Sequence, residues 1–440
     1  MIVMKFGGTS VGSAERIRNV ADIVVSRLDK GPAVVVSAVG GITDKLIESS
    51  NVAVNGESPD EHLTFIENKH HEILRELGLD ESLVDDLLSE FREVIMGIKE
   101  KKEADVKTMD IVQSFGERMS SRIVAGHLTK IGHKAFACFA WDYGMITDDN
   151  FEGAEPLKSS FKVMKEKVSG VDGIPIITGF IGKNEDGEIT TLGRGGSDYT
   201  AALYGAALGA EEIQIWTDVD GVMTADPRVV SDAQTILQVS FAEASELAYL
   251  GAKVLHPKTI IPAMNKNIPV RVLNTYNVDG EGTVILKEAG KSDKTVKAIT
   301  AKKNVIVLNI TSSRMLDAHG FLAKIFTIFA KNNKSVDMIS TSEVSVSLTI
   351  DNDKDLDKIE KQLGKIAYVR VEKEKAIISL IGEGMKCTYG LAGKIFTALG
   401  NHKINIDMIS QGASEINVGF VVDSAAADKV VKLLHEEVFG

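Results

Sequence analysis

The sequence predicts an α/β protein with a mainly parallel sheet, followed by a duplicated α+β module. Glycine-rich loops repeatedly follow apolar strand-like runs and precede helical segments, an order typical of parallel α/β sheets. Runs such as residues 33–37 and 174–180 are almost continuously apolar, as strands buried on both faces are. Residues 320–340 recur at a constant offset as residues 390–410, with the segments KIFT and DMIS unchanged, which indicates an internal repeat.

The composition excludes several classes of protein. The chain has 440 residues, more than one ordinary domain, and is 44% hydrophobic and 25% charged, as globular proteins are. The net charge of −12, without a free-standing run of Lys or Arg, argues against nucleic acid as the main partner. No apolar stretch approaches the length of a membrane span, so we expect no membrane partner. Cys138 and Cys387 fit neither a CxxC nor a metal spacing, and we expect reduced thiols and a cytoplasmic protein.

The first third of the chain predicts two loops at strand ends. A strand at residues 2–4 leads into the glycine loop 5–12 (KFGGTSVG) and a helix to about residue 28, with Thr9 or Ser10 able to cap it. The strand at 33–37 leads into a second flexible loop, 38–43 (AVGGIT). Ligands of such sheets bind at the carboxyl ends of the strands, where both loops fall.

The middle of the chain continues this order. Residues 60–104 are charge-rich with helical periodicity, and the helix expected at 110–125 carries Glu117. A hairpin at 184–187 connects the strand at 174–180 to the segment 190–203 (TTLGRGGSDYTAAL). The elements expected after it are a strand at 213–218, turns at 219–221 and 226–228, a short helix at 243–250 and a strand at 270–273.

The segment 190–203 predicts an anion site. Gly193, Gly195 and Gly196 permit positive φ and close approach to a ligand. Ser197 or Asp198 could cap the following helix, whose N-terminus attracts anions, and Arg194 adds a planar donor pair. Taken alone, this stretch could equally be a tight βα turn.

Several anion sites at one sheet edge indicate phosphoryl transfer. Lys5 beside Gly7 and Gly8 suits a phosphate, although a plain βα turn is the alternative there as well. The Walker pattern and the protein-kinase signatures HRD and DFG are absent from the sequence. A carboxylate acceptor would be ionised near pH 7 and would need no general base. The chemistry then needs positive charge and positioning, from Lys5, Arg194, helix N-termini and Mg²⁺.

The C-terminal repeat predicts two copies of a small βαββαβ unit. Residues 320–327 (GFLAKIFT) match 390–397 (GLAGKIFT), and the match continues without a gap to DMIS at 337–340 and 407–410. Two residues are then inserted before SEINV at 414–418, which matches SEVSV at 342–346. A duplicated α+β module behind a larger α/β domain suggests a sensor attached to an enzyme.

At these motifs the chain resembles, essentially end to end, the aspartate kinases of the amino-acid kinase family. The resemblance rests on residues 5–10 (KFGGTS), 193–198 (GRGGSD), 216–221 (WTDVDG) and 253–257 (KVLHP), and the tail is similar to their tandem ACT domains. It implies a three-layer αβα sandwich with a mainly parallel sheet, followed by two ferredoxin-like ACT domains. The implied domains are a catalytic domain at 1–285, a linker at 286–296, a first ACT domain at 312–381, and a second at 297–311 plus 382–440.

The resemblance implies ATP-dependent phosphorylation of the β-carboxylate of L-aspartate to 4-phospho-L-aspartate, the first step towards lysine, threonine and methionine. Lys5 and Asp198 would be catalytic, with ATP and Mg²⁺ as cofactors and no metal site built by the protein alone. The implied aspartate-binding residues are Ser37, Thr43, Glu117, Arg194 and Ser197, and the implied nucleotide-binding residues are Lys5, Gly7, Gly8, Thr217, Asp218, Met223, Arg228 and Lys253. Met223 stands where many relatives have a tyrosine, so its contact is open.

The resemblance also implies feedback inhibition by an end-product amino acid at the ACT domains of a homodimer or higher homo-oligomer. The first copy resembles the lysine-sensitive type most, and threonine is the alternative. The implied effector-binding residues are Met315, Phe321, Leu322, Ser335, Val336 and Asp337, with Asp337 facing an ammonium group.

Two other functions remain to be weighed. A kinase of the same superfamily acting on another acid or on a nucleotide, as acetylglutamate and uridylate kinases do, is disfavoured by the ACT tail and by the pairing of Glu117 with Arg194. A non-catalytic amino-acid sensor is disfavoured because Lys5 and Asp198 are both present as well.

Overall fold

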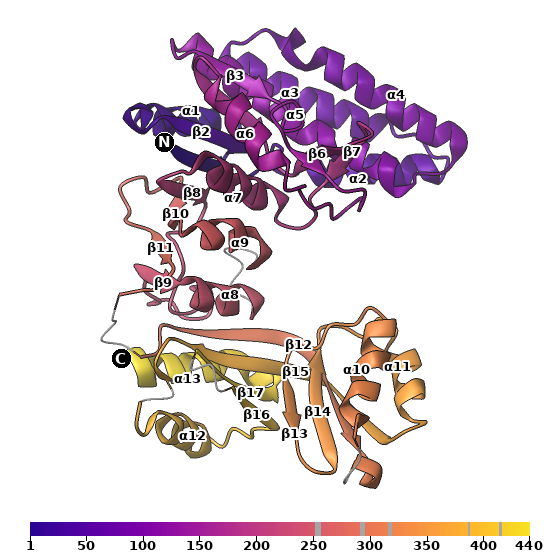
Figure 1. Cartoon of the computed structure of the whole chain (residues 1–440), viewed down its shortest axis with the longest axis vertical. Coiled ribbons are helices and arrows are strands. Elements are labelled where there is room, and N and C mark those ends of the chain that lie inside the picture. Colours follow the sequence, from indigo (N-terminus) through magenta and orange to yellow (C-terminus); the bar gives the residue numbers. More distant parts are fainter. Residues whose placement is uncertain (251–256, 291–294, 316–318, 386–387, 413–415) are drawn as a thin grey trace. The chain divides into compact units, whose positions relative to one another are not determined.

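A computed structural model describes residues 1–250, 257–290, 295–315, 319–385, 388–412 and 416–440 (Figure 1). Its contacts form two compact units. The first unit contains residues 1–222, 237–241 and 254–289, and the second contains residues 223–236, 242–253 and 290–440. The sequence predicted one catalytic domain over 1–285, whereas two short pieces of that range group with the second unit. The predicted domain boundaries themselves stay predictions.

The first unit is built on an eight-stranded sheet that is parallel except where β10 meets β11. The α/β class with a mainly parallel sheet is therefore confirmed. β2 has every residue buried, because helices cover both faces of such a sheet. In spatial order its strands are β3 (Ala135–Cys138), β5 (Ile174–Thr178), β2 (Pro32–Val36), β1 (Ile2–Phe6), β8 (Glu212–Thr217), β10 (Val270–Asn274), β11 (Thr283–Leu286) and β9 (Gln238–Ser240).

A second, three-stranded sheet in this unit contains the predicted hairpin. β6 (Ile181–Asn184) and β7 (Ile189–Thr191) pair antiparallel across it, and β4 (Ile146–Thr147) pairs parallel with β6. β7 leads directly into the glycine-rich segment that precedes α7 (Gly196–Leu208). This small sheet therefore sets where that segment begins.

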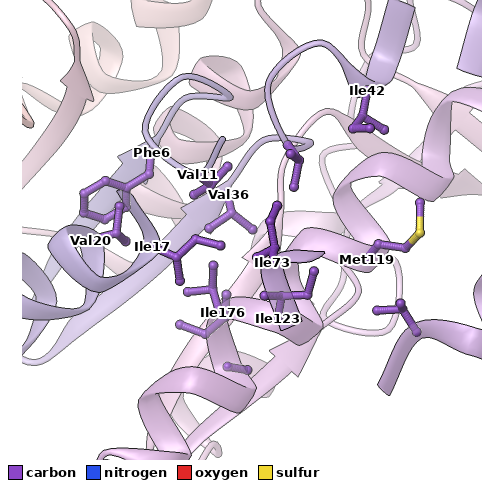
Figure 2. Packing of buried hydrophobic residues seen from close by; sticks show 14 of the residues in the cluster. Phe6, Val11, Ile17, Val20, Val36, Ile42, Ile73, Met119, Ile123 and Ile176 are labelled. Atoms are coloured by element: carbon purple, nitrogen blue, oxygen red, sulfur yellow. The ribbon is translucent and has the colours of Figure 1, made fainter. Parts of the chain in front are cut away.

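Helices pack their apolar faces on the large sheet of the first unit. Figure 2 shows Phe6, Val36 and Ile176 from three of the strands together with Ile17 and Ile123 from two helices. Besides α7, the helices of this unit are α1 (Ala14–Val25), which carries Ile17, α2 (Ile42–Val54), α3 (Asp60–Leu77), α4 (Asp85–Lys101), α5 (Val106–Lys130), which carries Ile123, α6 (Ser160–Ser169) and α9 (Pro257–Lys266), with 3₁₀ turns at Leu28–Lys30 and Glu81–Val84. The predicted cap of the first helix was wrong, because α1 begins later and Ser13 caps it by accepting from the N–H of Arg16.

The second unit is built on a six-stranded antiparallel sheet. In spatial order its strands are β13 (Ile339–Thr341), β14 (Ser345–Ile350), β12 (Ala298–Thr311), β15 (Tyr368–Ile381), β17 (Asn417–Asp423) and β16 (Met408–Gln411). Its helices are α8 (Phe241–Tyr249), whose first residue belongs to the first unit, α10 (Phe321–Lys331), α11 (Leu356–Leu363), α12 (Leu391–Asn401) and α13 (Ala427–Phe439), with 3₁₀ turns at Ser313–Met315 and Ser424–Ala426.

The long strand β12 contributes to two separate hydrophobic cores. Ile299 packs in a core with β15, β17, α12 and α13, whereas Ile306 and Leu308 pack in a core with β14, α10 and α11. A break in register at Asn304, which has φ of 61°, lies between them, as expected of a β-bulge. The resemblance implied that residues 297–311 belong to the second ACT domain; β12 contributes to both cores, and this boundary stays a prediction. Among the described residues, no helix is long and apolar enough to cross a membrane.

Candidate active site

A pocket of about 600 Å³ lies in the first unit where β1 and β2 end. It is also lined by α5 and by the segment from β7 into α7. This position, beyond the carboxyl ends of parallel strands, is the usual ligand site of such sheets. The predicted site residues that the pocket brings together are Lys5, Gly8, Ser37, Thr43, Glu117, Arg194, Ser197 and Asp198.

Lys5 and Asp198 form an ion pair in this pocket. Lys5 Nζ lies 2.6 Å from Asp198 Oδ1, and the two side chains are only 12% and 16% exposed. Lys5 is the penultimate residue of β1, and Asp198 is in the first turn of α7. A charge-assisted contact of this kind holds a flexible lysine in one place, so the ammonium group is available at a defined position in the pocket.

The N-terminus of α7 is left open to the pocket. Its N-cap is Gly195, with φ of 73°, and no side chain caps it, so the predicted capping by Ser197 or Asp198 was wrong. Both residues instead lie in the first turn. Because the first N–H groups of a helix have no partner within it, they can bind an anion here.

Two glycines permit the close contacts that shape the pocket. Gly193 has φ of 73°, and a Cβ there would lie 2.8 Å from the carbonyl oxygen of Glu152. A Cβ on Gly8 would lie 2.9 Å from the carbonyl oxygen of Ala38, so the first two glycine loops meet backbone to backbone. The carbonyl of Gly7 accepts from the N–H of Ser10 and closes the first loop. Larger residues would push these walls apart.

Glu117 is a buried carboxyl group facing this pocket. It is 4% exposed, and its Oε2 has no hydrogen-bond partner among the described residues. Burial raises the pKa of Glu117 to about 8, although a hydrogen bond from the backbone of Ala38 and the charge of Lys5 act in the opposite direction. An unpartnered buried carboxylate is costly, so a cation that enters the pocket would bind it strongly.

The predicted nucleotide-binding residues are divided between the two units. Thr217 ends β8, and its hydroxyl donates to the carboxylate of Asp218, at the same edge of the sheet as the pocket. Met223 and Arg228 belong to the second compact unit, where Arg228 pairs with Asp226. The structure does not describe Lys253 or residues 254–256, which follow it in the same motif.

Sequence reasoning missed other residues that line the pocket: Asp44, Gln113, Glu152, Phe180 and Thr191. Gln113 lies one turn before Glu117 on α5, so the helical period could have revealed it. Nothing in the sequence signals Phe180, which has φ of 68° although it is not a glycine. Such strained conformations are concentrated at functional sites.

The predicted effector residues lie in the second unit around its first repeat. Met315 and Val336 pack against the core that contains Phe321, while Leu322 is exposed. Asp337 Oδ2 lies 3.0 Å from the ammonium group of Lys302 on β12, and Oδ1 accepts from the hydroxyl of Tyr249 at 2.8 Å. The ammonium that Asp337 faces in this structure is therefore one from the chain itself.

The second repeat has the same arrangement of charges. Asp337 and Asp351 flank Lys302, and Asp407 and Asp423 flank Lys375 on β15. In the second copy, Lys375 Nζ lies 2.6 Å from Asp407 Oδ2 and 2.8 Å from Asp423 Oδ1. The repeat detected in the sequence therefore extends to a pair of Asp–Lys–Asp clusters.

The fold and the pocket define a member of the amino acid kinase family with a C-terminal ACT region. The sequence matches the amino acid kinase family over residues 1–274 and an ACT domain over residues 308–358 and 378–438. It is 42% identical to chloroplastic aspartokinase 2 of Arabidopsis thaliana, over 99% of this chain and 84% of that protein. Within the amino acid kinase family, the chain belongs to the aspartokinases.

Solved structures agree with this assignment. The crystal structure of E. coli aspartokinase III with aspartate and ADP, described as the R-state, is 36% identical and covers 100% of both chains with a TM-score of 0.86. The structure of the same enzyme with lysine and aspartate, described as the T-state, is 36% identical with the same coverage and a TM-score of 0.81. The amino-acid kinase and ACT folds expected from the sequence are therefore confirmed.

Proposed function

We propose that this protein transfers the γ-phosphoryl group of ATP to the β-carboxylate of L-aspartate, producing 4-phospho-L-aspartate and ADP. The observation that carries the proposal is a single pocket holding the Lys5–Asp198 pair, the buried carboxyl of Glu117 and the guanidinium of Arg194. These groups have the charges that an amino-acid dicarboxylate and a transferring phosphoryl group require. The R-state relative, which carries aspartate and ADP, supports the same pair of reactants.

The residues divide between binding and charge stabilisation. Glu117 receives the ammonium group of aspartate and Arg194 receives its α-carboxylate, with Ser37, Thr43 and Ser197 as hydroxyl donors around them. The β-carboxylate attacks phosphorus without a general base, because it is already ionised near pH 7. As the bond to the β-phosphate oxygen breaks, Lys5 offsets negative charge on the transferring group, and Asp198 holds Lys5 in place.

Mg²⁺ is proposed as the ion that accompanies ATP. No group of three or more His, Cys, Asp or Glu side chains that could hold a metal ion occurs among the described residues. Mg²⁺ commonly uses one or two carboxylates, substrate phosphates and water, so Asp198 in the pocket is compatible with it. When bound with the nucleotide, the ion supplies positive charge that reduces repulsion between ATP and aspartate.

Feedback inhibition by lysine at the first repeat is the second part of the proposal, with threonine as the alternative effector. Asp337, Ser335 and Val336 precede β13, and Asp337 suits an ammonium group because it pairs with one already. The T-state relative carrying lysine supports this effector. A homodimer or higher homo-oligomer through the ACT region, and a cytoplasmic location, remain predictions from the sequence.

An enzyme-linked assay of ADP formation tests the activity directly. Turnover is expected with ATP and L-aspartate, and lysine is expected to reduce it. Acetylglutamate, uridylate and other acceptors serve as controls. Turnover with another acceptor and none with aspartate would show a different kinase, and silence with every acceptor would favour a non-catalytic sensor.

A further inference from the structure

Asp110 is a fully buried carboxylate on α5 that does not line the pocket itself. Its Oδ2 accepts from the backbone N–H of Thr191 at 2.8 Å and from that of Glu152 at 3.0 Å. Its Oδ1 accepts from the hydroxyl of Thr191 at 2.7 Å. Within the described part of the chain, no cation pairs with Asp110, so N–H and O–H donors of two other segments satisfy it.

Burying a carboxylate without a cation costs free energy, and burial raises the pKa of Asp110 even though these donors oppose the rise. An arrangement of this cost suggests a role beyond filling space. The donors come from the loop around residue 152 and from the end of β7, which lie far from α5 in the sequence. Asp110 therefore ties both segments to one helix.

Both tied segments form walls of the pocket. Glu152 and Thr191 line it, and Arg194 follows Thr191 by three residues. The two segments also hold each other, since the N–H of Ala154 donates to the carbonyl of Thr191 at 2.8 Å. A shift at residue 191 would therefore move Arg194 as well as Glu152.

The other end of this connection is Glu117. It lies seven residues after Asp110 on α5, which places both on the same face of that helix. One rigid helix thus carries the carboxyl that faces an ammonium group and also anchors the loop that carries the guanidinium.

We propose that Asp110 is a positioning residue that sets the spacing between Glu117 and Arg194, and thereby the affinity for aspartate. This inference rests on the proposed function, because it assumes that these two residues bind the two ends of the amino acid. A displacement of about 1 Å between such groups is enough to change a rate or an affinity severalfold to a hundredfold.

The test compares KM values for the two substrates. In Asp110→Asn, an NH₂ group replaces one acceptor and faces N–H or O–H donors. The KM for aspartate is expected to rise by about tenfold or more, while the KM for ATP changes less than about twofold. Asp148→Asn is the matched control, because the carboxylate of Asp148 accepts from the N–H groups of Asn150 and Glu155 in the same loop but is only half-buried. It is expected to leave both KM values unchanged.

Thr191 supplies a second, milder pair of variants. Thr191→Val removes only the hydroxyl donor and is expected to raise the KM for aspartate by a smaller factor. Thr191→Ser keeps the hydroxyl, and its KM for aspartate is expected to equal that of the wild type. Should Asp110→Asn fail to fold, this pair decides the question. Equal changes in both KM values, or a lower melting temperature with an unchanged KM for aspartate, would overturn the positioning role. Absence of aspartate turnover in the wild type would instead overturn the proposed function.

Discussion

Lys5 Nζ lies 2.6 Å from Oδ1 of Asp198, and this pair joins the end of the first strand to the first turn of α7. The contact forms within the sheet edge that also holds the glycine loops. It fixes a positive charge at the point where an anion bound at the helix N-terminus would lie. The pair therefore connects the fold to the charge stabilisation that phosphoryl transfer requires.

Replacing Lys5 by Met is expected to lower kcat by a factor of about 10²–10³, because one preorganised positive charge is lost from the transition state. Steady-state assays with saturating aspartate and ATP measure this, and circular dichroism checks the fold. Lys134→Met is the control, since Lys134 makes an ion pair of the same length with Asp172 on an exposed surface. A near-normal kcat in Lys5→Met would remove Lys5 from the mechanism.

Glu117 predicts a pH dependence of aspartate binding. With a pKa of about 8, its carboxyl group is mostly neutral at pH 7 in the free enzyme and becomes anionic as the pH rises. The anion binds the substrate ammonium, so the KM for aspartate is expected to fall as pH rises through about 8. Glu117→Gln should raise this KM and flatten its pH profile. The same pH profile in wild type and variant would contradict the assignment of Glu117 to the substrate ammonium. Glu48→Gln is the control, because Glu48 is an exposed acid on α2.

The same carboxyl predicts a change in stability with pH. Its pKa in the folded state, about 8, is above its ordinary value of 4.5, so the folded protein holds the extra proton between these values. The free energy of unfolding contributed by this group therefore falls as pH rises from about 4.5 to about 8. Glu117→Gln lacks this titrating group. The melting temperature of the variant minus that of the wild type should therefore increase as the pH rises across this range. A difference in melting temperature between wild type and variant that is the same at every pH would contradict the burial of an ionising group here.

The parallel sheet, the hairpin and the glycine loops beside Lys5 and Arg194 could be predicted from the residues, because glycine loops and apolar runs are local signals. Ser37, Thr43, Glu117 and Ser197 were expected in the site only from the resemblance to the aspartate kinases. It did not predict the open N-terminus of α7, since Ser197 and Asp198 are common capping residues and only the backbone shows that Gly195 holds that position. Asp110 was also missed. Its importance comes from Thr191 and Glu152, which are distant in sequence and meet it only in the folded chain. Non-local hydrogen bonds of this kind leave no periodic pattern.

The ammonium group of Lys302 is expected to compete with the effector lysine for Asp337. If lysine places an ammonium group on Asp337, it must displace the ammonium of Lys302 that lies there now. Lys302→Met is expected to lower the lysine concentration for half-maximal inhibition by about tenfold, which corresponds to about 1.4 kcal/mol. Inhibition is expressed relative to the activity of the same variant without lysine.

The second repeat provides a matched control for this experiment. Lys375→Met removes the equivalent ammonium from Asp407 and Asp423 and should leave the inhibition curve unchanged. Equal shifts in both variants would indicate a general effect on the sheet rather than competition at Asp337. Weaker inhibition in Lys302→Met would show that Lys302 helps to bind the effector.

A buried ion pair in the second unit predicts a large and selective loss of stability. Lys297 Nζ lies 2.8 Å from Glu243 Oε2, with the two side chains 8% and 0% exposed, and Glu243 Oε1 accepts from the N–H of Glu383. Lys297→Met removes the ammonium from a buried carboxylate and should lower the free energy of unfolding by about 3–5 kcal/mol. The matched variant Lys303→Met breaks the exposed pair that Lys303 on β12 makes with Asp428, and it should cost no more than about 1 kcal/mol. Urea unfolding followed by fluorescence measures both losses, and similar losses in the two variants would show that burial does not determine the contribution of this pair.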